Sequence, residues 1–240
     1  MYLVELVLTA AVLLTLLYAS ILDLRTREVG VRVWLPAGLL SVILNLWFGN
    51  YNPLQLLITS IPALLVLVFA VLDMMGGADF LALLVITLAH PKIFPKPLTY
   101  LTLIYSLIIP AVLILRNLIY GLRHLNDYKK LKCIKGSKKI LLLLGRPANI
   151  DSFFYSKFTY LLTIPVDPQK ALFECRASFS LDDAYEGKIK SNVEELLDKG
   201  SLKADDIVWV TPGLPQITFY LFGYVLALIT PESLLHLIIP

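Results

Sequence analysis

Six apolar runs constrain what this chain can fold into. A helix that crosses a bilayer needs about 20 predominantly apolar residues, because the hydrocarbon core is about 30 Å thick. The chain has a mean hydropathy of +0.75 and is 58% hydrophobic, whereas soluble domains are roughly 45–50% apolar. We therefore predict a membrane all-α bundle of six transmembrane helices. The runs cover Tyr2–Leu22, Trp34–Phe48, Leu54–Met75, Phe80–Ala89, Tyr100–Leu118 and Gln216–Ile239.

The polar stretch between the fifth and sixth runs predicts a small α+β domain. Its short apolar segments favour strands at Ile140–Leu144, Phe158–Ile164 and Leu172–Phe179, and Asn192–Lys199 favours a helix that stops at Gly200. The predicted organisation is helices one to five in residues 1–119, the α+β domain in 120–213 and helix six in 214–240.

The distribution of basic residues predicts the orientation. Cytoplasmic loops carry an excess of Lys and Arg, so the segments richer in these residues are expected inside. The α+β domain is then cytoplasmic, and both termini lie outside after six crossings. The richer segments hold Arg25, Arg27, Arg32, Arg116, Arg123, Lys129, Lys130 and Lys132, and the opposite ones hold Lys92 and Lys96.

Two aspartates stand where a membrane protein pays a penalty for an acid. Asp23 ends the first apolar run, and Asp79 directly precedes the fourth. An ionisable group at bilayer depth costs about 2.5–3.5 kcal/mol on insertion scales, so it marks a functional site. The fourth run spans only about 15 Å at 1.5 Å per residue, which predicts that Asp79 lies below the membrane surface in a cavity or thinned patch. A surface-lying or re-entrant fourth segment is the alternative. Both aspartates belong to the predicted cytoplasmic side.

A pair of carboxyl groups can hydrolyse a peptide bond with a water molecule. One carboxylate activates the water as a base while the other, still protonated, protonates the carbonyl or the leaving nitrogen, because like charges at close range do not both ionise. The sequence does not distinguish the base from the acid. Gly76 and Gly77 would let the backbone leave helical geometry and let a substrate strand approach closely.

Other classes of function have little support in the sequence. A net charge of +3 is far below that of typical nucleic-acid-binding domains, so no nucleic-acid partner is expected. The two cysteines, Cys133 and Cys175, form no Cys-x-x-Cys motif and the three histidines are scattered, which argues against a metal site and against a disulfide framework. We predict no cofactor, and membrane lipid as the surroundings.

The two aspartate segments resemble known motifs. Ile21-Leu22-Asp23-Leu24-Arg25-Thr26-Arg27-Glu28-Val29 resembles the first aspartate motif of the type IV prepilin and archaeal preflagellin peptidases, and Gly76-Gly77-Ala78-Asp79 resembles their Gly-x-Gly-Asp (GxGD) motif. Trp209-Val210-Thr211-Pro212-Gly213-Leu214-Pro215 also resembles the archaeal members. The resemblance implies a membrane aspartic endopeptidase, with Asp23 and Asp79 as catalytic residues. It would cut short, positively charged leader peptides from archaellin (preflagellin) and type IV pilin-like precursors at the cytoplasmic face.

The chain departs from the family pattern in two places. Ala78 replaces the second glycine of the motif, and because Ala rarely takes a positive φ we expect it to be helical or extended. Only about ten residues join the first two apolar runs, so the cysteine-bearing insert of the bifunctional bacterial enzymes is missing. N-methylation of the product is therefore not expected.

Several residues and functions keep a second interpretation. Asp23 could pair with a nearby arginine, and Asp79 could simply cap the fourth run. Asp73 could perturb the pair. Arg27 and Glu28 could contact the leader or set topology, and Thr211 and Pro212 could shape the start of the last span. The whole chain could instead be a proton-coupled carrier with relay aspartates, or a membrane anchor for its soluble domain.

Overall fold

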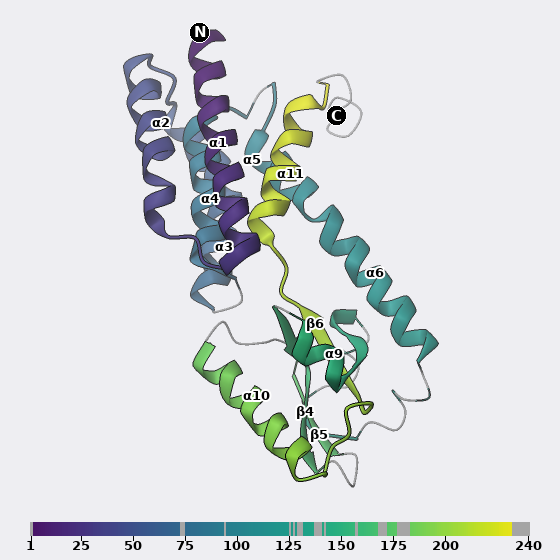
Figure 1. The fold of residues 1–240 in the computed structure, drawn as a ribbon. Helices are drawn as coiled ribbons and strands as arrows, with labels where there is room; N and C mark the ends of the chain where they lie inside the picture. Colours follow the sequence, from purple (N-terminus) through teal and green to yellow (C-terminus); the bar gives the residue numbers. More distant parts are fainter. Residues whose placement is uncertain are drawn as a thin grey trace. The chain divides into compact units, whose positions relative to one another are not determined.

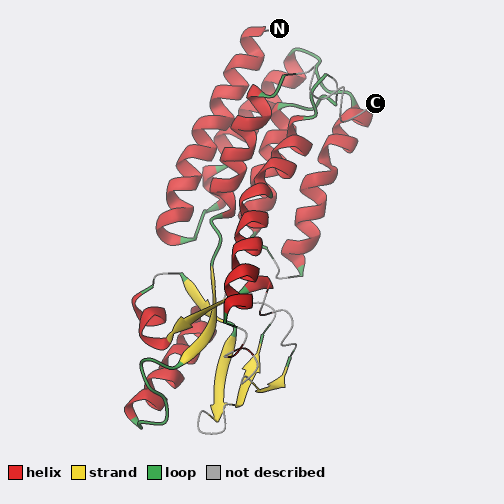
Figure 2. Cartoon of the chain, turned by 90° about the vertical axis from the view of Figure 1, so that its right-hand side faces the viewer, coloured by secondary structure: helices red, strands yellow, loops and turns green. Residues whose placement is uncertain are grey.

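The computed structural model describes residues 2–231, except 73–74, 94, 125, 127, 129–131, 137–140, 142, 157, 168–171 and 177–182. The chain divides into two compact units, Met1–Ile109 with Pro215–Pro240, and Pro110–Leu214. In the described residues the first unit is helical, and the second contains the strands (Figure 1, Figure 2).

The first unit is a bundle of apolar helices. Its connections are short, and Asn52 begins one helix by accepting hydrogen bonds from the backbone N–H groups of Leu54 and Gln55, the usual role of an N-cap asparagine. Pro62 lies inside that same helix. The elements are α1 (Tyr2–Thr26), the 3₁₀ helix η1 (Val31–Val33), α2 (Leu35–Trp47), α3 (Pro53–Val71), α4 (Gly77–Ala89), α5 (Leu98–Ser106) and α11 (Gln216–Ile229).

The helix α4 is the centre of this bundle. It contacts α1, α2, α3, α5 and α11, and its residues Ala82, Leu83 and Ile86 have no exposed surface. Its 13 residues span about 20 Å at 1.5 Å per residue, less than the thickness of a hydrocarbon core. Asn45 of α2 donates its Nδ2 to the carbonyl of Leu88 at 2.8 Å, which ties α2 to the last turn of α4.

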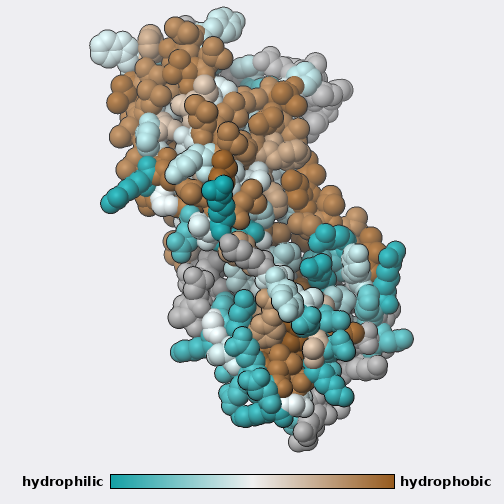
Figure 3. Space-filling view, in the orientation of Figure 1, coloured by the Kyte–Doolittle hydropathy of each residue, from teal (hydrophilic) through white to brown (hydrophobic). Residues whose placement is uncertain are grey.

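Three of the helices are long and apolar enough to cross a membrane. They are Tyr2–Thr26, Pro53–Val71 and the continuous stretch Leu98–Arg123, while Val31–Trp47, Gly77–Ala89 and Gln216–Ile229 are shorter apolar helices. Large apolar side chains such as Leu14, Leu39 and Leu57 are more than half exposed, and brown apolar surface dominates the helical part in Figure 3. This surface fits lipid better than water.

The fifth apolar run forms two helices rather than one. A break at Leu107 separates α5 from α6 (Ile108–Arg123), and the Leu107 N–H bonds the Ile104 carbonyl in a tighter turn. Pro110 has no N–H to donate to the carbonyl four residues earlier, which explains the interruption at this place. The second helix also continues past the predicted end at Leu118.

The second unit contains two three-stranded sheets. In the first, β5 (Leu172–Cys175) lies between β1 (Lys132–Lys135), which is parallel to it, and β4 (Thr163–Asp167), which is antiparallel. In the second, β6 (Ile207–Pro212) lies between β2 (Arg146–Asn149) and β3 (Thr159–Leu161), both antiparallel. The second unit also contains the helices α9 (Ile150–Tyr155) and α10 (Asp183–Asp198).

The cores of the second unit are small, and a disulfide reinforces them. Phe153, Ile189 and Val208 belong to one apolar cluster, which joins α9, α10 and β6. The sequence argued against a disulfide framework, and this prediction was wrong. Cys133 and Cys175 form a disulfide that links β1 to β5. Cysteine spacing in the sequence gave no sign of the disulfide, since only the pairing of these strands brings the two residues together.

The elements predicted inside this unit were partly correct. Strand structure occurs in Phe158–Ile164 and Leu172–Phe179, but a break at Leu162 divides the former between β3 and β4. The predicted strand at Ile140–Leu144 is wrong, because its described residues 141, 143 and 144 are helical. Leucine is a strong helix former, so an all-Leu stretch does not specify a strand. The predicted helix at Asn192–Lys199 begins earlier, at Asp183.

Candidate active site

Asp23 lies in the last turn of α1, against the first turn of α11. The residue is 7% exposed, and its Oδ2 accepts a hydrogen bond from the backbone N–H of Ile217 at 3.2 Å. Ile217 is the second residue of α11, where backbone N–H groups have no partner within the helix and a negative charge is stabilised. Ser20, one turn earlier, donates its hydroxyl to the Ile217 carbonyl at 3.4 Å. These contacts fix the end of α1 on the start of α11.

Arg27 adds a positive charge beside Asp23. Its Nη1 lies 3.8 Å from Asp23 Oδ1, and its φ of 61° ends α1 in the left-handed region. The Thr26 hydroxyl bonds the carbonyls of Leu22 and Glu28, which shapes this turn, while the Glu28 side chain is exposed. Arg27 and Glu28 were both predicted to contact the leader or to set topology. Of these two, the structure brings Arg27 to Asp23.

Asp79 is the third residue of α4 and bonds back to the residue that begins the helix. The side chain is 9% exposed, and its Oδ2 accepts the Gly76 N–H at 3.1 Å while its own N–H donates to the Gly76 carbonyl. This is half of the reciprocal arrangement known as a capping box. The N-cap is thus Gly76 rather than Asp79.

The glycines of the second motif do not use their extra conformational freedom. Gly76 is extended, with φ −76° and ψ 147°, and Gly77 and Ala78 are helical. Alanine is therefore compatible with the third motif position, as the sequence predicted. A Cβ at Gly76 would lie 3.5 Å from Asp79 Oδ2, whereas one at Gly77 would meet open space. Gly76 is thus the glycine that adjoins the carboxyl group.

The fold brings the two aspartates to the same end of the helical bundle. Asp23 stands at the end of α1 and Asp79 at the start of α4, and their charges are close enough to interact. Leu16, Leu83 and Ile217 belong to one apolar core that joins α1, α4 and α11 around them. At the opposite end Lys92 pairs with Glu5 at 3.3 Å. The arrangement is a pair of carboxyl groups in an apolar bundle, held by backbone N–H groups.

The remaining predicted residues lie elsewhere or outside the described residues. Thr211 and Pro212 belong to β6 of the second unit, where they face Tyr160 and Thr159 of β3. Asp73 is outside the described residues. Among those that the structure describes, no three His, Cys, Asp or Glu side chains are grouped so that they could hold a metal ion.

Sequence reasoning missed two groups of α11 that adjoin the aspartates. One is the Ile217 N–H, a backbone group without a side-chain signature. The other is Tyr220, which is fully buried and close enough to Asp79 for that carboxylate to act electrostatically on its hydroxyl. A tyrosine four residues after the predicted start of a span was the available signal.

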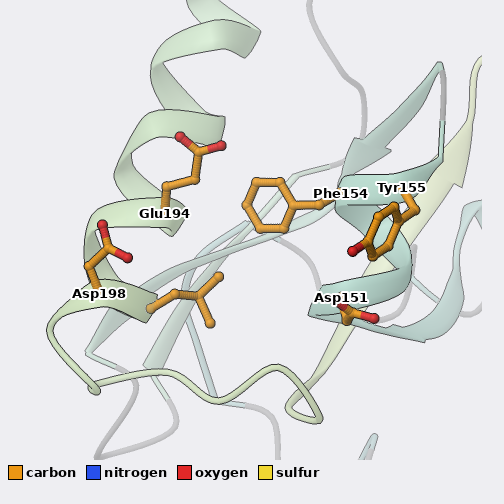
Figure 4. Close-up of a pocket in the computed structure, with 6 residues that line it drawn as sticks. Asp151, Phe154, Tyr155, Glu194 and Asp198 are labelled. Carbon is orange, nitrogen blue, oxygen red and sulfur yellow. The ribbon is translucent and has the colours of Figure 1, made fainter.

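The second unit carries an open pocket that contains neither Asp23 nor Asp79. It is a hollow of about 390 Å³ between α9 and α10, lined by Asp151, Phe154 and Tyr155 of α9 and by Glu194 and Asp198 of α10 (Figure 4). The three carboxylates are exposed, as on an ordinary solvated surface.

An apolar helical bundle with two buried aspartates at one end defines a membrane protein with an acidic site. Comparison with known families identifies it further. Residues 10–115 match the Type IV leader peptidase family, and residues 137–231 match the Archaeal Peptidase A24 C-terminus Type II family. The chain belongs to the type IV leader peptidases, a family that includes the archaeal preflagellin and prepilin peptidases. No curated protein matches the chain in sequence.

The first match includes both aspartates, and the second includes α11. The family resemblance drawn from the two aspartate segments is therefore confirmed. The family makes this chain a peptidase whose substrates are prepilin-like precursors.

Proposed function

We propose that the chain is a membrane-embedded aspartic endopeptidase. It removes the short, positively charged leader from archaellin and type IV pilin-like precursors at the cytoplasmic face of the membrane. The observation that carries the proposal is the pair Asp23 and Asp79, which are buried at the same end of the bundle, one in the last turn of α1 and the other in the first turn of α4. Membership in the leader peptidase family supplies the class of substrate.

The chemistry requires one proton shared between the two carboxyl groups. The ionised carboxylate takes a proton from water, and the resulting hydroxide attacks the carbonyl carbon of the scissile bond. The protonated partner donates to the carbonyl oxygen and the proton passes on to the leaving nitrogen as the C–N bond breaks. Enclosure by α1, α4 and α11 strengthens these interactions because an apolar site has a low dielectric constant.

The proposed topology has six crossings, with the α+β domain of residues 120–213 in the cytoplasm. The three shorter apolar helices, Val31–Trp47, Gly77–Ala89 and Gln216–Ile229, complete the six. The excess of Lys and Arg in the segment after α1 and in the second unit favours their cytoplasmic location. Both termini are then outside. A precursor whose apolar helix shares the lipid can present its leader junction to the aspartates from that side.

Isosteric amides test the role of the pair. In membranes that contain the full chain and a prepilin-like precursor, Asp23→Asn and Asp79→Asn are each expected to abolish leader cleavage, because an amide neither takes nor gives the required proton. Asp151→Asn, the same change at an exposed acid of the second unit, is the control and should cleave normally. Both site variants should still insert and unfold at the temperature of the unaltered protein. Cleavage retained by either one would contradict the assignment.

A further inference from the structure

The first two turns of the last helix bond Asp23 and place Tyr220 in the apolar core that α11 shares with α4, the helix of Asp79. The Ile217 N–H bonds the Asp23 carboxylate. Tyr220, three residues later and therefore on the same face of the helix, lies close enough to Asp79 for that carboxylate to act electrostatically on its hydroxyl. A single helix thus adjoins the two groups that the proposed reaction needs, although neither aspartate belongs to it.

The Tyr220 hydroxyl is a polar group with no structural use in the described residues. The side chain has no exposed surface. Among the described residues, its oxygen makes no hydrogen bond of good geometry, although the Gln216 side chain approaches it. Buried hydroxyl groups are almost always bonded, and leaving one unpaired is costly. Phenylalanine would fill the same space without that cost, so the oxygen needs another explanation.

Asp79 has an oxygen that can accept this hydroxyl. Its Oδ2 is occupied by the Gly76 N–H, and no hydrogen bond to Oδ1 is found in the described part of the chain. An acid that exchanges protons with water and substrate must keep a defined orientation, because proton transfer requires hydrogen-bond distance and alignment. In the described residues a single backbone N–H bonds this carboxyl group, so a second hydrogen bond, to Oδ1, would fix its orientation more firmly.

We propose that Tyr220 is a positioning residue of the active site, whose hydroxyl donates to Oδ1 of Asp79 in the transition state of cleavage and holds that carboxyl toward the hydrolytic water. This inference rests on the proposed aspartic peptidase function. It adds α11 to the catalytic machinery.

Tyr224 provides a matched comparison one turn further along the same helix. It is also fully buried, but its hydroxyl bonds His90 Nε2 at 2.7 Å. His90 directly follows α4, at the end of that helix opposite Asp79. Removing the Tyr224 oxygen therefore breaks a structural hydrogen bond, whereas removing the Tyr220 oxygen removes only the proposed contact with Asp79.

The test compares Tyr220→Phe with Tyr224→Phe in the full-length protein in detergent. We expect Tyr220→Phe to lower kcat for a prepilin-like precursor about 10- to 100-fold, the effect of losing one hydrogen bond to a charged group. KM should stay unchanged, and the unfolding temperature should hold or rise, because the variant removes a buried hydroxyl that has no partner among the described residues of the free protein. Tyr224→Phe should lower the unfolding temperature and leave kcat within about twofold of the starting value. An unchanged kcat in Tyr220→Phe, or an equal loss in both variants, would overturn the proposal.

A binding measurement separates positioning of Asp79 from contact with substrate. In the Asp79→Asn background, which binds but does not cleave, adding Tyr220→Phe should leave the dissociation constant of the precursor unchanged. Weaker binding would assign Tyr220 to the substrate instead and overturn the inference. Cleavage by Asp79→Asn itself would instead refute the aspartic mechanism, so the two failures are distinguishable.

Discussion

At the scale of single residues, one threonine hydroxyl joins the two sheets of the second unit. Thr163 Oγ1 in β4 accepts the backbone N–H of Trp209 in β6 at 2.8 Å, and both residues have no exposed surface. Thr163→Val keeps the shape but leaves that N–H buried without a partner, which costs about 1–3 kcal/mol. We expect hydrogen exchange of residues 207–212, measured on the full chain in detergent, to show a local opening free energy lower by that amount.

Thr159→Val in β3 is the control for this substitution. Thr159 is also buried, but the described residues give its hydroxyl no bond between the sheets. Equal exchange of residues 207–212 in the two variants would show that the Thr163 hydrogen bond contributes nothing measurable.

Residues of the candidate site differ in how far the sequence could predict them. Asp23 and Asp79 stand out because an acid next to an apolar run is costly in lipid. Their partners, the N–H groups of Ile217 and Gly76, are present at every non-proline residue and have no sequence signature. The contact between residues 23 and 217 depends on packing of the first and last helices, which hydrophobic periodicity does not reveal.

At the scale of elements, the close approach of α5 and α11 depends on one glycine. A Cβ at Gly223 would collide with the Thr102 carbonyl and lie 2.9 Å from the Ser106 nitrogen, both backbone atoms of α5. We expect Gly223→Ala to force the helices apart at a cost of about 1–3 kcal/mol, and to displace α11 from Asp23. Thermal unfolding in detergent should occur at a lower temperature, and leader cleavage should slow.

Gly38→Ala in α2 is the matched control for Gly223→Ala. A Cβ there would lie 3.8 Å from Val85 Cγ2, an ordinary contact, and Ala is the better helix former by about 1 kcal/mol. The unfolding temperature should therefore hold or rise. If both variants unfolded alike, the tight α5–α11 contact would not limit stability.

Elements with a long apolar run could be predicted, and those made by distant pairing could not. The run at Trp34–Phe48 corresponds closely to α2 (Leu35–Trp47), because composition alone favours a helix in lipid. The strand β2 consists of Arg-Pro-Ala-Asn and exists through pairing with β6, some 60 residues later in the chain. Strand propensity depends strongly on such neighbours.

At the scale of the whole molecule, the distribution of charge gives the proposed topology a direct test. Orientation follows Lys and Arg near span ends, and the second unit carries many of them, including the exposed Lys188, Lys199 and Lys203. Lys92 follows α4 at the end of the bundle opposite the aspartates, with a side chain that is 33% exposed. The native lysines therefore report on both membrane faces without any substitution.

An impermeant amine reagent applied to sealed vesicles distinguishes these faces. In inside-out vesicles we expect modification of Lys188, Lys199 and Lys203 but protection of Lys92, and in right-side-out vesicles the reverse, as measured by mass spectrometry of tryptic and chymotryptic peptides. Detergent should expose all four. The topology bears on catalysis because Asp23 and Asp79 stand at the end of the bundle opposite Lys92. Modification of Lys92 and Lys199 from the same side would contradict the odd number of crossings proposed between α4 and the second unit. It would also contradict cleavage at the cytoplasmic face.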